Sequence, residues 1–191
     1  MAHTPRIEHP GDYHVVCRGN NKQPIFLDDG DRLMFAKLLN RIATRYGWTI
    51  FAYCLMGNHY HIVMRIGEAG MSRGMCQLNG TYALAFNDRH GRINHVFGRR
   101  YRSAELRSEH HFLAACRYVL QNPVRAGLVK SPDEYTWSSY RATIGLALDI
   151  VRTASDDLLR MFSGDRDQAI LSLVEFCTPS VPPGPVQRQP P

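Results

Sequence analysis

GWTIFAYCLMGNHYHIVM, residues 47–64, is the stretch that decides the fold of this chain. Residues 48–56 are almost wholly apolar and predict a buried strand. Gly57 and Asn58 then form a two-residue turn signal, and residues 59–66 return as a second strand. We therefore predict a β-hairpin at this point of the chain.

The returning strand carries two histidines, His59 and His61, which point to the same side because they are two residues apart. Tyr60, Ile62 and Met64 point to the opposite face, where burial holds the strand in register. Two neutral imidazoles at this spacing can chelate one divalent metal and leave positions for oxygen ligands and substrate. The spacing alone also fits ordinary surface or core histidines, so both interpretations stay open at this stage.

The residues before the hairpin predict one strand and one helix. Residues 13–18 are short and rich in β-branched side chains, as in a strand, and residues 19–24 are dense in turn residues. A helix is predicted to begin at a cap formed by Asp28 and Asp29 and to end at Gly47, because its apolar residues recur at helical spacing.

The residues after the hairpin continue the alternation. Ser72 is predicted to cap a helix that runs to about residue 88, and residues 96–106 are extended and basic, as in an edge strand. Ser108 opens a further helix, which we expect to end at Asn122 because Pro123 disfavours helix in the residue before it. This order implies an α+β fold with a small antiparallel sheet and helices packed on it.

The chain is expected to have three parts. Residues 8–145 form the main domain, and residues 146–177 form a helical extension with helices at 156–162 and 166–176. Residues 178–191 contain six prolines and are expected to be a disordered Pro-rich tail.

Composition is that of an ordinary soluble protein, with 44% hydrophobic and 21% charged residues. No apolar run is long enough to cross a bilayer and residues 1–10 lack a signal-peptide core, so a bacterial cytoplasmic location is expected. The net charge of +6 comes almost wholly from arginine and favours polyanions. No two of the cysteines have thiolate zinc spacing, and we expect them to be reduced: Cys17, Cys54, Cys76, Cys116 and Cys177.

The third predicted helix places Tyr118, Asn122 and Arg125 at positions i, i+4 and i+7, on one face. That face offers a phenol, an amide oxygen that can bind metal and a guanidinium that can hold phosphate. The spacing equally fits a tyrosine at a helix–sheet boundary, an asparagine near a helix end and an exposed arginine.

A basic stretch precedes this helix. Between residues 89 and 107 the only acid is Glu105, while Phe97 and Tyr101 are interleaved with six arginines, which are Arg89, Arg92, Arg99, Arg100, Arg102 and Arg107. Arginines mixed with aromatic residues are typical of a groove for single-stranded or distorted nucleic acid. The alternative is an edge strand that is protected from aggregation by its charge. We favour the nucleic-acid interpretation.

With these segments in place, the sequence resembles the REP-associated tyrosine transposases. These are single-tyrosine HUH (His-hydrophobic-His) transposases of the insertion-sequence-200-like group. The resemblance covers about residues 10–145 and rests on strings that occur in family order, namely YHVVCRGNNKQPIF, GWTIFAYCLMGNHYHIVM, SRGMCQLNGTYALAFN, HVFGRRYRS, RYVLQNPVRAGLV and YTWSSYRA.

The resemblance implies a ferredoxin-like fold that binds Mg²⁺ or Mn²⁺ and cleaves and rejoins single-stranded or hairpin DNA through a 5′-phosphotyrosine intermediate. It implies that His59 and His61 bind the metal and that Tyr118 is the nucleophile. Asn122 takes the place of the third metal ligand, where many relatives of the insertion-sequence type carry glutamine. The residues expected to bind DNA are Arg18, Asn20, Arg89, Arg92, Arg99, Arg100, Arg102 and Arg125.

Two other functions are weighed against this one. A hairpin-DNA-binding protein that no longer cleaves would use the same arginines. A metallohydrolase would need a carboxylate cluster, and Glu68, Asp88 and Glu105 show no ligand-like spacing. For the transposase, no general base is identified beyond His111 as a weak candidate. We expect neither a membrane nor a small-molecule substrate, and we favour a monomer over a dimer.

Overall fold

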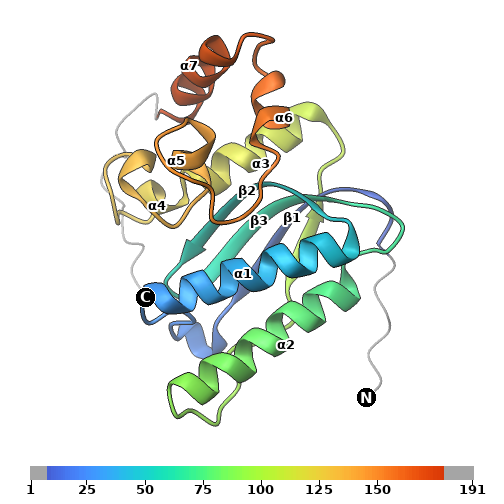
Figure 1. Ribbon diagram of the computed structural model, residues 1–191, viewed down its shortest axis with the longest axis vertical. Helices are drawn as coiled ribbons and strands as arrows, with labels where there is room; N and C mark the ends of the chain where they lie inside the picture. The colour runs from blue at the N-terminus through green and yellow to red at the C-terminus, as the bar shows by residue number, and fades with distance from the viewer. Residues whose placement is uncertain (1–7, 179–191) are drawn as a thin grey trace, which may run out of the picture.

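The computed structural model describes residues 8–178 and is built around one antiparallel sheet (Figure 1). Its strands lie in the order β2-β3-β1-β4, and their bounds are β1 (Gly11–Arg18), β2 (Thr49–Met56), β3 (His59–Ile66) and β4 (Arg102–Glu105). The two longest helices are α1 (Asp29–Tyr46) and α2 (Ser72–Arg89). This order of strands and helices is the ferredoxin-like α+β fold that the sequence predicts.

The remaining helices follow β4 along the chain. They are α3 (Glu109–Leu120), α4 (Asn122–Arg125), α5 (Tyr140–Thr143), α6 (Ser155–Arg160) and α7 (Arg166–Cys177), with two short 3₁₀ turns, η1 (Asn20–Lys22) and η2 (Pro132–Glu134). No helix in the described part of the chain is long and apolar enough to span a membrane. Apart from Thr178, the Pro-rich tail predicted as disordered lies outside the described residues.

Each face of the sheet carries its own apolar cluster. On one face Tyr13, Val15 and Cys17 of β1 pack with α1 and α2, which run side by side (Figure 1). On the other face Phe51 of β2 and Val63 of β3 pack with α3, α5, α6 and α7. The second group of helices packs on β2 and β3. The part of this face that β1 and β4 form lines a cleft.

Local signals explain why the predicted elements form. The Asp28 carboxylate accepts a hydrogen bond from Asp31 N at 3.0 Å and caps α1, and Gly47 ends the helix in the left-handed conformation, with φ of 66°. Ser108 caps α3 in the same way through His111 N. These three boundaries agree with the sequence prediction.

Two predictions of helix boundaries are wrong. Ser72 is not a cap but the first residue of α2, and the carboxylate of Glu8 accepts hydrogen bonds from the backbone N–H groups of Met71 and Ser72. The helix expected to end at Asn122 ends at Leu120, and a further turn, α4, follows it. Pro123 lies in the first turn of α4, where its missing N–H has no partner to lose.

The predicted edge strand 96–106 is also shorter than expected, because only Arg102–Glu105 pairs with β1. The residues before it fold over the turn at η1 instead. Asn20 N donates to Val96 O at 2.9 Å, Gly98 N donates to Arg18 O at 3.2 Å, and the side chain of Val96 enters the apolar core.

Candidate active site

A cleft of about 1130 Å³ lies on the part of the sheet that the second group of helices leaves uncovered. Strand pairing brings the polar side chains of the cleft to one face of the sheet, because residues directly opposite in an antiparallel pair point to the same face. Arg18 lies opposite His59, and Val16 lies opposite both His61 and Arg102. The helical wall of the cleft is α3 with α4, and the η1 turn closes one end.

His59 and His61 lie side by side in this cleft, with ring centroids 4.9 Å apart and planes at 81°. His59 Nδ1 is 2.6 Å from Asn58 Oδ1, an acceptor, which favours the tautomer with the proton on Nδ1 and a free lone pair on Nε2. Tyr60, between them, points into the core as predicted and donates to Asn79 Oδ1 at 2.7 Å.

Both histidines are held in the neutral form. Burial lowers the pKa of His61 to about 3, helped by the nearby His14, His59 and Arg18. Burial and Arg18 also lower the pKa of His59, against a hydrogen bond with the Asn122 side chain that raises it. Neutral imidazoles have the free lone pair that a metal ligand needs.

His14 is a third histidine of the cleft, which the sequence analysis missed. Its Nε2 is 2.9 Å from His61 Nδ1, and the two rings stack at 5.2 Å. Burial, with a smaller effect of His111, lowers the pKa of His14 to about 4. The alternation of β1 was the signal available, because Tyr13, Val15 and Cys17 on the core face leave His14 on the opposite face.

Tyr118 projects from α3 beside the histidines. Its ring centroid is 5.5 Å from that of His61 and 5.7 Å from that of His14, and both contacts are edge-on. The residue is 38% exposed and lines the cleft, so it is open to a substrate that binds there. Arg125 lies over the other side of the ring, with its guanidinium carbon 5.2 Å from the centroid.

Asn122 is nearly buried, at 7% exposure, and its side chain reaches the His59 ring. The structure therefore brings together the four residues that the sequence pointed to, His59, His61, Tyr118 and Asn122, in one cleft. Two neutral imidazoles and an amide side chain in one cleft fit a divalent cation that keeps further positions for water and phosphate oxygens. His111 also lines the cleft.

Six of the residues expected to bind DNA line the same cleft, namely Arg18, Asn20, Arg99, Arg100, Arg102 and Arg125. None of the five arginines is paired with a carboxylate within residues 8–178. Gly19 sets the turn that carries Asn20, because a Cβ at this position would lie 2.1 Å from Gln23 O. The cleft therefore combines two imidazoles, an amide, a phenol and guanidinium groups that pair with no carboxylate among the described residues.

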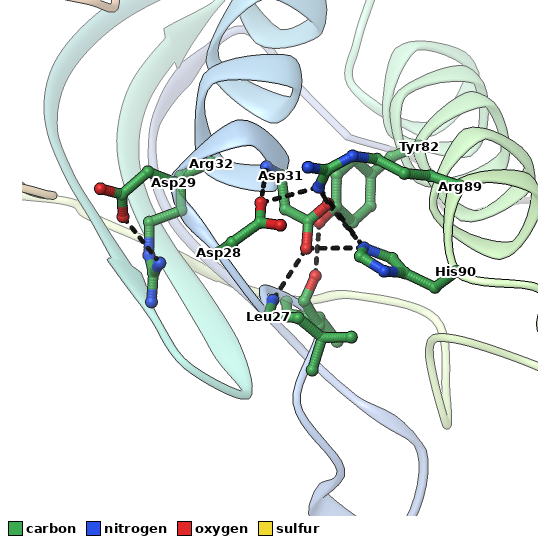
Figure 2. A network of polar contacts seen from close by, with 9 residues as sticks. Leu27, Asp28, Asp29, Asp31, Arg32, Tyr82, Arg89 and His90 are labelled. Carbon is green, nitrogen blue, oxygen red and sulfur yellow. Dashed lines mark hydrogen bonds and ion pairs between the residues drawn. The ribbon is translucent and has the colours of Figure 1, made fainter.

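Arg89 and Arg92 lie elsewhere. Arg89, near the end of α2, donates to the carboxylates of Asp28 and Asp31 at the start of α1 (Figure 2). Arg92 donates to Gln23 Oε1 at 2.9 Å and lies over Phe86. The expectation that these two arginines bind DNA gains no support from their positions.

The same network contains a group of possible metal ligands, Asp28, Asp31 and His90, whose ligand atoms lie within 4.8 Å of one another. The guanidinium of Arg89 already lies against both carboxylates, and His90 Nε2 is 2.9 Å from Asp31 Oδ1 (Figure 2). A bound cation would have to displace Arg89. We therefore interpret this group as an ion-pair network that joins α1 to α2.

Comparisons with known proteins bear on this site. The family model described as "Transposase IS200 like" matches residues 9–122, a range that includes the His pair, Tyr118 and Asn122. A search of curated proteins found no match to the sequence.

Two solved structures were matched by the comparison of folds. A REP-associated tyrosine transposase bound to a REP hairpin has a TM-score of 0.62 and 16% identity, over 81% of this chain and 96% of that one. A candidate transposase from Deinococcus radiodurans has a TM-score of 0.43 and 17% identity, over 62% of this chain and 95% of that one. Of the two, the first supports the assignment of the fold.

Proposed function

The chain belongs to the IS200-like transposase family, and on that premise we propose that it cleaves and rejoins single-stranded or hairpin DNA through a phosphotyrosine on Tyr118. The observation that carries the proposal is the single cleft in which Tyr118 lies edge-on to His61, beside His59 and Asn122. The alternative, a hairpin-binding protein without cleavage, would not need these groups to converge.

The proposed substrate is DNA with an unpaired or hairpin region, of the repetitive extragenic palindrome type. The fold neighbour that is bound to a REP hairpin supports this class. So does the cleft itself, where Arg18, Arg99, Arg100, Arg102 and Arg125 are free to contact phosphates. Asn20 at the η1 turn adds an amide that can contact DNA.

The residues of the cleft account for the chemistry. A phenol is almost fully protonated at neutral pH, so its attack needs electrostatic help. In the proposed reaction Tyr118 Oη bonds to phosphorus as the bond to the 3′-oxygen breaks. The phenolic proton leaves to solvent, the 3′-oxygen takes up a proton, and the 5′-phosphate stays on Tyr118. Rejoining reverses these steps with another 3′-hydroxyl and needs no ATP.

His59, His61 and Asn122 are the proposed holders of a divalent cation, Mg²⁺ or Mn²⁺. Such an ion would stabilise the negative charge that develops on the scissile phosphate during the transfer. The protein's own contribution is to keep both imidazoles neutral and oriented, through burial, Asn58 and His14.

We further propose that a single chain suffices. The His pair and Tyr118 that form the cleft all come from one chain, so no second copy is needed to complete the site. This supports a monomer that acts where DNA is found, in the bacterial cytoplasm, without a membrane or a small-molecule substrate.

A covalent-adduct assay tests the proposal. End-labelled single-stranded hairpin DNA incubated with the protein and Mg²⁺ should give an adduct that survives denaturation. Tyr118→Phe should abolish the adduct and leave DNA binding within about threefold, because only a hydroxyl is lost. His59→Ala should reduce adduct formation strongly in Mg²⁺ and Mn²⁺ alike.

The other outcomes separate the alternatives. Cleavage by Tyr118→Phe with release of free ends would favour a metallohydrolase that uses water. Binding without any adduct, in wild type and variant alike and over a range of hairpin sequences, would favour the binding protein.

A further inference from the structure

A second hollow, of about 480 Å³, adjoins the cleft at Tyr118 and lies between α3 and α7. Ala114, Tyr118 and Arg125 line both hollows, so the two meet at the proposed nucleophile. We propose that this α3–α7 groove binds the DNA strand where it continues past the scissile phosphate, with Arg117 as its phosphate contact and Phe176 as an apolar surface for a base. This inference rests on the proposed function.

Arg117 is the residue that points to an anionic ligand. Its guanidinium carbon lies over the Phe176 ring, 5.0 Å from the centroid, a cation–π contact that helps to hold the side chain in place. No carboxylate within residues 8–178 pairs with it, and its buried Nε atom has no hydrogen-bond partner. An arginine that is held in place yet unpaired is ready to make charge-assisted hydrogen bonds to a phosphate.

The groove is a fixed feature of the fold, since α7 is anchored to the end of α3. Gln121 Nε2 donates to Cys177 O at 2.7 Å in a buried hydrogen bond. Leu173 and Cys177 of α7 are buried in the same cluster as Cys116 of α3. Phe176 also packs on Phe162, with ring centroids 5.5 Å apart. Arg117 and Phe176 therefore keep their relative positions without a ligand.

The path that a bound DNA strand would follow past Tyr118 supports the assignment. A strand whose phosphate lies at Tyr118 continues on both sides of that phosphate. The sheet cleft, with Arg18, Arg99 and Arg102, can take one side. The α3–α7 groove takes the other, because Arg125 bridges the two hollows and Arg117 follows further along the same wall.

The chemical character of the groove fits single-stranded DNA. Besides Arg117 and Arg125 it is lined by His110, and its apolar surface comes from Leu113 and Phe176. Positive groups next to an aromatic face are what an unpaired strand recognises, through its phosphates and its bases respectively. Arg117 and Phe176 also line a neighbouring hollow of about 370 Å³ together with Glu175, which forms no ion pair with Arg117.

Binding of a fluorescent 20-nucleotide oligothymidylate to the full chain, measured by anisotropy in EDTA at several salt concentrations, tests the proposal. Arg117→Gln should weaken binding about tenfold, the scale of one lost charged hydrogen bond. It should also reduce the magnitude of the slope of log K against log salt concentration by about 0.7, the value for one phosphate contact on a single strand. Phe176→Leu should also weaken binding, because it removes the aromatic surface for a base and the ring that positions Arg117.

Arg152→Gln is the matched control. It removes the same charge from an exposed arginine that lines neither hollow and whose backbone N–H bonds to Asn40 on α1. The proposal predicts wild-type affinity for this variant. Equal weakening by Arg117→Gln and Arg152→Gln would overturn it, as would wild-type affinity and slope in both. Unchanged thermal unfolding of Arg117→Gln excludes loss of structure as the cause.

The adduct assay distinguishes this inference from the proposed function. Normal adduct formation by the wild type with no binding defect in Arg117→Gln would contradict the proposed groove and leave the proposed function intact. A binding defect in Arg117→Gln without any adduct in the wild type would leave a DNA groove on a protein that does not cleave.

Discussion

At the scale of single residues, the contact between His14 and His61 does most to prepare the proposed metal site. His61 Nδ1 faces His14 Nε2 at 2.9 Å, so a proton on His61 Nδ1 leaves its Nε2 lone pair free for the metal. Asn58 does the same for His59. Each proposed imidazole ligand thus has its own orienting partner, and the two partners come from different elements, β1 and the hairpin turn.

We expect His14→Ala to weaken Mn²⁺ binding by about 10- to 100-fold, the usual effect of losing a partner that orients a histidine ligand. His14→Gln keeps an acceptor near His61 Nδ1 and should recover part of that loss. Isothermal titration with Mn²⁺ in the absence of DNA measures the effect apart from cleavage. His95→Ala, which removes an exposed histidine outside the cleft, is the control. Equal affinity in His14→Ala and His95→Ala would show that His14 does not orient the site.

At the scale of elements, the sequence predicts best those features whose causes are local. The hairpin, the cap at Asp28 and the stop at Gly47 follow from neighbouring residues and agree with the structure. The grouping of Tyr118 and Asn122 follows from helical spacing, and the presence of both on one wall of the cleft agrees with it. The family resemblance, which added the His pair to this group, is matched by the family model.

What the sequence could not predict depends on contacts between distant residues. His14 meets His61 only through the register of two strands, 47 residues apart in the chain. Arg89 is bound by Asp31, 58 residues away in the chain. It therefore does not line the cleft with the other arginines of the basic stretch, a difference that the sequence pattern does not indicate. The short β4 reflects how residues 96–101 fold over η1, and no local pattern encodes that path.

The ion-pair network at the start of α1 makes a prediction about pH (Figure 2). Burial by itself would raise the pKa of Asp31, but hydrogen bonds from His90, Leu27 N and Arg89 outweigh it and lower the pKa. Hydrogen bonds from Arg89 and Asp31 N lower the pKa of Asp28 to about 2. Since both values lie below the unfolded value of about 4, the network stabilises the fold above pH 4 and loses this effect as the pH falls toward 2.

We expect Asp31→Asn to lower the free energy of unfolding by about 3 kcal/mol at pH 7, because it leaves Arg89 and His90 without their buried partner. The loss should shrink as the pH falls from 4 to 2. Urea unfolding at several pH values measures both effects. Asp29→Asn, which removes an exposed pair with Arg32, should change stability by less than about 0.5 kcal/mol. A loss in Asp31→Asn that stays constant down to pH 2 would contradict this account.

At the scale of the whole molecule, the C-terminal helices share a core with the sheet. Leu158 of α6 and Leu173 of α7 are buried in one cluster with Phe51 of β2 and Phe112 of α3. Ala154 N also donates to Ile50 O at 2.7 Å. The segment that the sequence marks as an extension is therefore expected to unfold together with the sheet.

Leu173→Ala should lower the free energy of unfolding by about 3 kcal/mol, as expected for a buried leucine, and shift one common transition. Leu171→Ala, which truncates a leucine that is 63% exposed on the same helix, should have little effect. Far-ultraviolet circular dichroism and tryptophan fluorescence should give the same midpoint. An early transition seen by dichroism alone would mean that α6 and α7 unfold separately.

The most direct measurement of the central claim is to identify the amino acid that carries DNA after the reaction. The protein is incubated with hairpin DNA and Mg²⁺, then digested with protease and nuclease, and its peptides are analysed by mass spectrometry. We predict a nucleotide mass on the tyrosine of the peptide that contains Tyr118, together with a free 3′-hydroxyl on the released DNA. A nucleotide on any other residue, or cleaved DNA with no modified peptide, would contradict the account.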